Sequence, residues 1–214
     1  MERSAVSFNP GSDYLYAIVH GLPRGWRPPA EGIGGAPVRT VPVRDVVVVA
    51  SHLATPVSRT PLNQAVHADV VEVAARAQSV LPFAFGTVLP QALEPWVCAR
   101  LPLVRASLRR LRGAVEMQVR LVSLDACPRD LEALARRLVD AAGVPTWAYR
   151  EAPRLAAASV TFLVRRRAVS EFLERIAPVA SRAAGVAVVP SGPLPPYSFT
   201  PSLETAASPV LAAS

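Results

Sequence analysis

Lysine is missing from this chain: every one of its 23 basic residues is an arginine. A chain without lysine cannot carry a Walker A phosphate loop, a lysine Schiff base or a lysine general base. The arginines outnumber the 16 acidic residues and give a formal net charge of +7. Because a GC-rich coding sequence also favours arginine, this charge is weak support for a nucleic-acid partner.

Cysteines and long apolar runs are scarce. The two cysteines, Cys98 and Cys127, lack the spacing of metal ligands, and we expect them to be reduced thiols. The longest uncharged apolar runs, 46–50 and 155–164, fall far short of the roughly 20 residues that a membrane-spanning helix needs. The first residues do not resemble a signal peptide. We therefore expect a soluble, cytoplasmic protein without a membrane partner.

Signatures of catalysis and of cofactor binding are missing as well. His67, Asp69 and the Ser51-His52 pair suggest a hydrolase triad, but no glycine-flanked nucleophile accompanies them. The glycine-rich segment 32–35 matches neither dinucleotide-binding nor P-loop spacing, so we interpret it as a flexible connection. The sequence predicts a non-enzymatic protein with no catalytic, cofactor-binding or metal-binding residues.

The most apolar feature present is the uncharged stretch 79–89. Because apolar side chains occupy both alternating sets of positions, we expect one strand covered on both faces, in the middle of a sheet. Pro82 is then expected near the strand's entry, and Gly86 at a close approach of another group. Phe83 and Phe85 are predicted core residues, and Phe85→Ala is expected to cost about 3 to 5 kcal/mol.

The apolar spacing around this stretch predicts strands at 14–19, 38–41 and 45–50, a helix from Pro61 to Ala77, and a helix from Pro102 to Arg112. Arginines crowd one side of the second helix: Arg100, Arg105, Arg109, Arg110 and Arg112. This face has two interpretations. It binds an anionic partner, or it is a solvated helix face whose cations are favourably placed near the helix C-terminus.

The strand and helix pattern starts afresh at Gly113. It predicts strands at 115–121, 146–149, 157–164 and 186–189, with helices at 128–142 and 169–180. This βαββαβ order is typical of the ferredoxin-like fold. We predict an α+β protein with two ferredoxin-like α/β-sandwich domains in tandem, residues 13–112 and 113–200, the second ending in a proline-rich tail.

Three motifs carry a resemblance: Leu81-Pro82-Phe83-Ala84-Phe85-Gly86-Thr87-Val88, the junction Gly113-Ala114-Val115-Glu116, and the ending Ser191-Gly192-Pro193-Leu194-Pro195-Pro196-Tyr197-Ser198-Phe199. In this order they resemble the signatures of the gas vesicle protein F/L family, with departures at Ala84, Met117 and Leu194. The residues that form the expected structural motif are Leu81, Pro82, Phe83, Phe85, Gly86, Thr87, Glu116, Gly192, Pro193, Pro195 and Pro196.

The resemblance implies an accessory protein of gas vesicle assembly, associated with gas vesicles in the cytoplasm. Its implied partners are the hydrophobic shell protein and other accessory proteins, and it has no known catalytic centre. The prolines of the tail stiffen it, so two rings can be presented at low entropy cost. The candidate partner-binding residues are therefore Arg100, Arg105, Arg109, Arg112, Tyr197 and Phe199.

Two alternatives stay open. In the first alternative, the rings of Tyr197 and Phe199 pack between the two domains instead of binding a partner. The other alternative is an RNA-binding protein of ferredoxin-like fold, which the net positive charge allows, although no strand carries the basic-aromatic pattern of RNA-binding sheets.

Overall fold

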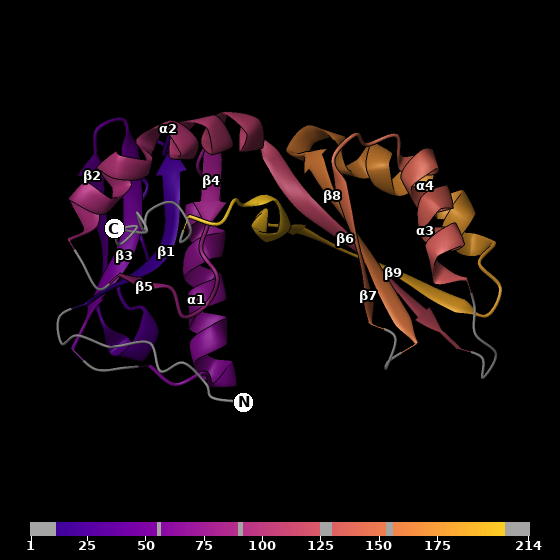
Figure 1. Ribbon diagram of the computed structural model, residues 1–214, viewed down its shortest axis with the longest axis horizontal. Coiled ribbons are helices and arrows are strands. Elements are labelled where there is room, and N and C mark those ends of the chain that lie inside the picture. Colours follow the sequence, from indigo (N-terminus) through magenta and orange to yellow (C-terminus); the bar gives the residue numbers. More distant parts are fainter. Residues whose placement is uncertain (1–11, 55–56, 90–91, 125–129, 153–155, 204–214) are drawn as a thin grey trace, which may run out of the picture. The chain divides into compact units, whose positions relative to one another are not determined.

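The computed structural model describes residues 12–54, 57–89, 92–124, 130–152 and 156–203 (Figure 1). The chain forms two compact units. One takes the chain up to Arg112 and again from Thr200, and the other is Gly113–Phe199. Each unit is built on an antiparallel sheet, so the mixed α/β class is confirmed. The assignment of both units to the ferredoxin-like fold, and the two domains 13–112 and 113–200, stay predictions.

The first unit combines the N-terminal sheet with two long helices (Figure 1). The strand order is β2-β3-β1-β4, and β5 also pairs with β1. Between β1 and β2 the chain forms a loop with one 3₁₀ helix, η1, in place of the α-helix that a βαββαβ order requires. The elements are β1 (Ser12–His20), η1 (Ile33–Gly35), β2 (Val38–Val43), β3 (Val46–Leu53), α1 (Pro61–Ala74), β4 (Ser79–Pro82), β5 (Val88–Leu89) and α2 (Leu93–Leu111).

The central strand of this sheet is β1. It pairs with β3 on one side and with β4 and β5 on the other, and residues 14–19 are fully buried. Tyr14, Tyr16 and Val19 share a core cluster with the buried face of α1. Helix α2 contacts β4, β1 and β2. Strand β1, and not the stretch 79–89, therefore occupies the middle of the sheet.

The stretch 79–89 is not one strand, which corrects the prediction. Strand β4 ends at Pro82, the chain turns at Phe85 and Gly86, and β5 resumes pairing with β1 at Val88. Pro82 thus lies at the end of a strand, where its missing N–H matters least. The turn leaves Phe85 half-buried, while Phe83 stays in the core.

Helix α2 begins nine residues before the predicted start at Pro102. Pro95 lies in its first turn, where backbone N–H groups have no partner within the helix, so proline is tolerated there. Pro102 lies inside the helix and removes one backbone hydrogen bond. The buried stripe of the longer helix recurs every three or four residues: Leu93, Trp96, Val97, Arg100, Val104, Ser107, Leu108 and Leu111.

The second unit has the strand order β7-β8-β6-β9, with every neighbouring pair antiparallel (Figure 1). Its core joins inward residues of β6 and β8, such as Met117, Val119 and Phe162, to the apolar faces of α3 and α4. The elements are β6 (Ala114–Ser123), α3 (Leu131–Ala142), β7 (Trp147–Ala152), β8 (Ala157–Arg165), η3 (Arg166–Ala168), α4 (Val169–Ser181), β9 (Val186–Leu194) and η4 (Tyr197–Phe199).

In this unit, the end of strand β9 and the start of helix α3 differ from the predicted bounds. Strand β9 runs to Leu194 instead of stopping at Val189, because the first part of the proline-rich tail still pairs with β6 across a register shift. Helix α3 begins at Leu131, where the side chain of Asp130 accepts a hydrogen bond from Ala133 N and caps the helix. The predicted start at Pro128 lies outside the described residues.

Candidate functional site

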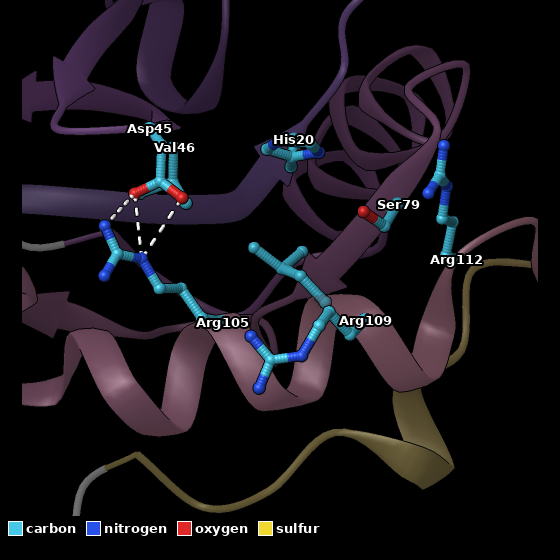
Figure 2. A pocket seen from close by; sticks show the side chains of 8 residues that line it. His20, Asp45, Val46, Ser79, Arg105, Arg109 and Arg112 are labelled. Carbon is cyan, nitrogen blue, oxygen red and sulfur yellow. Dashed lines mark hydrogen bonds and ion pairs between the residues drawn. The ribbon is translucent and has the colours of Figure 1, made fainter.

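The first unit contains a cavity that we call the arginine hollow (Figure 2). Its volume is about 240 Å³. The strands contribute one wall, since His20 ends β1, Ser79 begins β4 directly opposite it, and Asp45 lies in the turn between β2 and β3. Helix α2 contributes the other wall of the cavity. The lining residues are His20, Asp45, Val46, Ser79, Arg105, Leu108, Arg109 and Arg112.

Local sequence explains how the two walls are built. Strands β2 and β3 are joined by the two-residue turn Arg44-Asp45, in which Arg44 has a left-handed φ of 56°. On α2, a spacing of four residues places Arg105 and Arg109 on one side of the helix, and Arg112 follows directly after the helix ends at Leu111. Figure 2 shows Arg105 and Arg109 on α2, Arg112 just beyond its end, and His20, Asp45 and Ser79 across from the helix.

Arg105 and Asp45 form a bidentate ion pair across the hollow (Figure 2). Arg105 Nε donates to both carboxylate oxygens of Asp45, at 3.0 and 3.1 Å, and Nη2 donates to Oδ1 at 2.7 Å. These hydrogen bonds lower the pKa of the Asp45 carboxyl group and raise the pKa of Arg105. Because both side chains are solvent-exposed, the pair orients the guanidinium more than it stabilises the fold.

The other two arginines of the hollow do not contact Asp45 in this way. Arg112 Nη2 donates to the neutral amide oxygen of Gln78 at 3.2 Å, and Arg109 is exposed. Among the lining residues, the carboxylate of Asp45 faces three guanidinium groups. The hollow is therefore positively charged, even with His20 neutral.

Arg100 does not belong to this surface, which corrects its place among the partner-binding candidates. It falls in the buried stripe of α2, where Nε donates to Leu203 O at 2.8 Å and Nη1 donates to Trp96 O at 3.2 Å. Its guanidinium also lies 4.5 Å from the ring centroid of Trp96. Arg100 thus holds the returning C-terminal segment in the first unit, a role that depends on a residue 103 positions away.

The suggested triad is absent from the described part of the chain, because its members face different partners. His67 Nε2 lies 3.0 Å from Phe83 O, which can only accept, so Nε2 carries the proton. Nδ1 then accepts from the hydroxyl of Tyr14 at 2.8 Å. His52 instead lies beside Asp13.

This buried histidine organises the turn that follows β4. The Tyr14 hydroxyl accepts a hydrogen bond from Gly86 N at 3.0 Å while it donates to His67, so one phenol ties the turn to α1. Burial lowers the pKa of His67, and the imidazole is neutral. Sequence reasoning missed this network, although the position of His67 beside Val66 and Val70 on the apolar side of α1 offers a weak signal for it.

The glycine-rich loop is packed against a second buried hydroxyl. Tyr16 accepts a hydrogen bond from Ile33 N at 2.8 Å and lies 3.1 Å from Ser51 Oγ. Burial raises the pKa of Tyr16. A Cβ on Gly32 would lie 2.2 Å from the Tyr16 hydroxyl, so glycine is required there. The loop is thus anchored to β1 and β3, and the interpretation of a flexible connection is wrong at this point.

In the second unit, the junction motif and the C-terminal motif meet at Glu116. Its buried carboxylate accepts hydrogen bonds from Ser198 N at 2.8 Å and from Ser198 Oγ at 2.9 Å. Burial raises the pKa of Glu116, against the opposite effect of these bonds. A Cβ on Gly192 would lie 2.8 Å from Glu116 O, which explains why the tail has a glycine there.

The two candidate rings of the tail have different surroundings. Phe199 is 7% exposed and packs as part of the core, whereas Tyr197 is 37% exposed. Burial, and then the charge of Glu116, raises the pKa of Tyr197 to about 12. Of the two rings, Tyr197 is the one that offers a surface.

Within the described ranges, no group of three or more His, Cys, Asp or Glu side chains is placed to hold a metal ion. No helix there is long and apolar enough to cross a membrane. Cys98 is a partly buried free thiol, and Cys127 lies outside the described residues.

The family model and two solved structures that match this chain are of gas vesicle proteins. A model of the family described as "Gas vesicle synthesis protein GvpL/GvpF" matches residues 13–142 and 125–201. The crystal structure of the gas vesicle protein GvpF from Anabaena sp. PCC7120 is similar, with a TM-score of 0.75 and 17% identity over 89% of this chain and 96% of that chain. GvpF from Microcystis aeruginosa gives a TM-score of 0.73 and 14% identity over 89% and 99%. No curated protein matches the chain.

Proposed function

Because the chain belongs to the gas vesicle synthesis protein GvpL/GvpF family, we propose that it is a non-enzymatic accessory protein of gas vesicle assembly that binds the hydrophobic shell protein. The observation that carries this proposal is the family match, which extends from residue 13 to residue 201 and so takes in both units. Other accessory proteins of the vesicle are further proposed partners. The proposed place of action is the cytoplasm, at the vesicles.

Physical features of the surface support a binding role. Apolar side chains lie exposed on both units, among them Leu103 on α2, Trp147 on β7 and Tyr197 in the tail. Such groups can cover apolar surface of a shell subunit before it is built into the vesicle wall. The arginines of α2 steer acidic groups of the partner, and this attraction weakens as salt screens it.

Deletion of the gene in a vesicle-forming cell tests the proposal. We expect fewer or misshapen vesicles by electron microscopy, restored by the wild-type gene, and co-purification of the chain with the shell protein at low salt. Normal vesicles after deletion, together with no binding to shell or accessory proteins, would refute the assembly role. The RNA-binding alternative has no support from the family match or from the two crystal structures.

A further inference from the structure

Strand β7 lies at one edge of the second sheet, since within the described ranges it pairs with β8 alone (Figure 1). An edge strand leaves a row of backbone N–H and C=O groups that another extended chain can pair with. The other strands at the ends of the two sheets contain proline: Pro42 in β2, Pro82 in β4, and Pro190 and Pro193 in β9. Because proline removes N–H donors, β7 is the end strand best able to accept a further strand.

The hydrogen bonds to β8 indicate which backbone groups of β7 point to the open edge. In an antiparallel pair, alternate residues direct both their N–H and their C=O groups to the same neighbour. Leu163 N donates to Thr146 O at 3.0 Å, one step before the register of β7 and β8 begins. The residues that bond to β8 follow at every second position: Ala148, Arg150 and Ala152. The residues whose backbone groups point to the open edge are therefore the other three: Trp147, Tyr149 and Glu151.

The side chains of β7 indicate what an added strand has to carry. Trp147 lies opposite Phe162 of the core cluster, so the side chains of Trp147, Tyr149 and Glu151 are on the helix-covered side of the sheet. Arg150 is on the other side. Arg150 and Glu151 are exposed, and within the described part of the chain neither forms an ion pair. The Tyr149 hydroxyl donates to Glu151 Oε1 at 2.9 Å, which leaves the negative charge of the carboxylate uncompensated.

We propose that β7 accepts an extended segment of a protein partner as an added strand of the second sheet. The segment carries a basic residue opposite Glu151 and an acidic residue opposite Arg150, because opposite charges on facing strands stabilise a sheet and like charges destabilise it. Apolar residues of the segment lie beside Trp147 and Tyr149. Its backbone supplies the hydrogen bonds, and its alternating side chains set the register. This inference rests on the proposed function only for the identity of the partner as a protein of the vesicle.

A second copy of this chain fits the edge less well. Two β7 strands paired antiparallel about Tyr149 would place Glu151 opposite Trp147, so that no opposite charges face each other. Pairing about Arg150 would place two arginines opposite each other, which destabilises the pair. The charge pattern of β7 therefore favours a different sequence as the added strand.

A six-residue peptide, Thr-Arg-Glu-Val-Thr-Val with both ends capped, tests the inference on the full chain. Paired antiparallel with β7, it places its Arg opposite Glu151 and its Glu opposite Arg150. Binding is measured by NMR titration of the isotope-labelled chain. We expect the amide signals of β7 to shift. The amides of Trp147, Tyr149 and Glu151 should also exchange more slowly with deuterated solvent when the peptide is bound, because they become hydrogen-bonded.

N-methylated peptides separate strand addition from other modes of binding. Methylation of the first Val removes an N–H that points to β7, and we expect it to weaken binding about fivefold, as the loss of one hydrogen bond does. Methylation of the Glu, whose N–H points away from β7, is the matched control and should change binding less than about twofold. A peptide with its Arg and Glu exchanged should bind about threefold more weakly, and this difference should shrink as salt rises.

Two variants at one position of the chain locate the edge. Glu151→Pro and Glu151→Ala both remove the carboxylate, but only proline also removes the N–H that points to the open edge. We expect Glu151→Pro to bind the peptide about fivefold more weakly than Glu151→Ala does. Circular dichroism establishes that each variant keeps its fold. The methylated peptides, which act on the wild-type chain, keep the test independent of how well the proline variant folds.

Four outcomes would overturn the inference. They are no binding of the peptide, equal binding of the two methylated peptides, signal shifts confined to residues outside β7, and self-association of the free chain that Glu151→Pro abolishes. The last outcome would make a second copy the occupant of the edge.

Expression of the two variants in the deletion strain keeps this test apart from the proposed function. Vesicles restored by Glu151→Ala but not by Glu151→Pro would support strand addition at β7. If deletion disturbs vesicles and both variants restore them fully, the inference fails while the assembly role stands. If deletion leaves vesicles normal and the peptide still binds as expected, the assembly role fails while the binding edge stands.

Discussion

The two units bury their sheets in different ways. In the first, the central strand β1 has buried side chains facing both α1 and the opposite side, and it carries two buried tyrosines whose hydroxyls bind His67 and Ser51. In the second, the cluster between the sheet and the helices α3 and α4 is apolar, and the polar contact of Glu116 with Ser198 belongs to the tail. The first unit thus has buried hydrogen bonds in addition to its apolar core, whereas the core cluster of the second is apolar.

This difference matters for how each unit responds to change. An apolar core loses stability through the cavity that a truncated side chain leaves behind. A buried hydrogen-bond network loses stability when one member is removed and its partners stay buried without a bond. Substitutions in the two units should therefore differ in their dependence on pH as well as in their size.

The largest effect is expected in the apolar core of the second unit. Phe162 is fully buried, and its ring centroid lies 5.0 Å from that of Phe172. Phe162→Ala should lower the free energy of unfolding by about 3 to 5 kcal/mol, measured by urea denaturation of the full chain. Leu173→Ala, at an exposed position of α4, is the control, with an expected loss below about 1 kcal/mol. Equal losses for both variants would contradict the described core.

The buried network of the first unit should give the next largest effect. His67→Leu removes the hydrogen bonds that the imidazole makes with the Tyr14 hydroxyl and with the Phe83 carbonyl, at a cost of about 2 to 4 kcal/mol. Asp69→Asn, on the exposed side of the same helix, is the control and should be nearly neutral. A His67→Leu protein as stable as the wild type would show that the network contributes nothing.

His67 also predicts a pH dependence that the second unit's core lacks. Its pKa is lowered by burial, so the unfolded chain takes up a proton at a higher pH than the folded chain does. The contribution of the neutral imidazole is fully present above the unfolded value of about 6.5 and is lost as pH falls below it. Urea denaturation from pH 8 to pH 5 should show a smaller loss of stability in His67→Leu than in the wild type.

Within the first unit, the half-buried Phe85 can be compared with the buried Phe83. The Phe85 ring packs edge-on against Tyr14 and His67, with centroids 6.2 and 5.8 Å apart. We now expect Phe85→Ala to cost about 1 to 3 kcal/mol, less than the cost that a fully buried ring would give. Phe83→Ala, at a buried position, is the matched comparison and should cost more. The reverse order would restore the interpretation of 79–89 as a buried strand.

The smallest effect is expected at the tail. Ser198→Ala removes one hydroxyl bond to Glu116 but keeps the backbone bond, so the loss should be about 0.5 to 1.5 kcal/mol. Chymotrypsin cleavage after Tyr197 should be faster than in the wild type, because the tail opens more often. Ser202→Ala, at an exposed tail position, serves as the control. Unchanged cleavage would mean that the Glu116 contact does not hold the tail.

Local pattern was enough to predict most helices and strands of this chain. Thr60 and Pro61 start α1, and Gly143 ends α3 in a left-handed conformation, because caps and proline positions act within a few residues. The alternation that marks β1 and β6 is local in the same sense. The family resemblance, too, is carried by short motifs, and the family match bears it out.

Contacts between distant residues decided the rest. The turn after β4 depends on Tyr14 and His67, 53 positions apart, and the arginine hollow depends on Asp45 and Arg105, 60 positions apart. Arg100 is buried because Leu203 returns to α2, and Glu116 is bound by a serine 82 positions later. The spacing of residues within one element fixes which side chains share a face. Which face is then covered, and by what, is set by packing that brings separate elements together, and no local pattern encodes it.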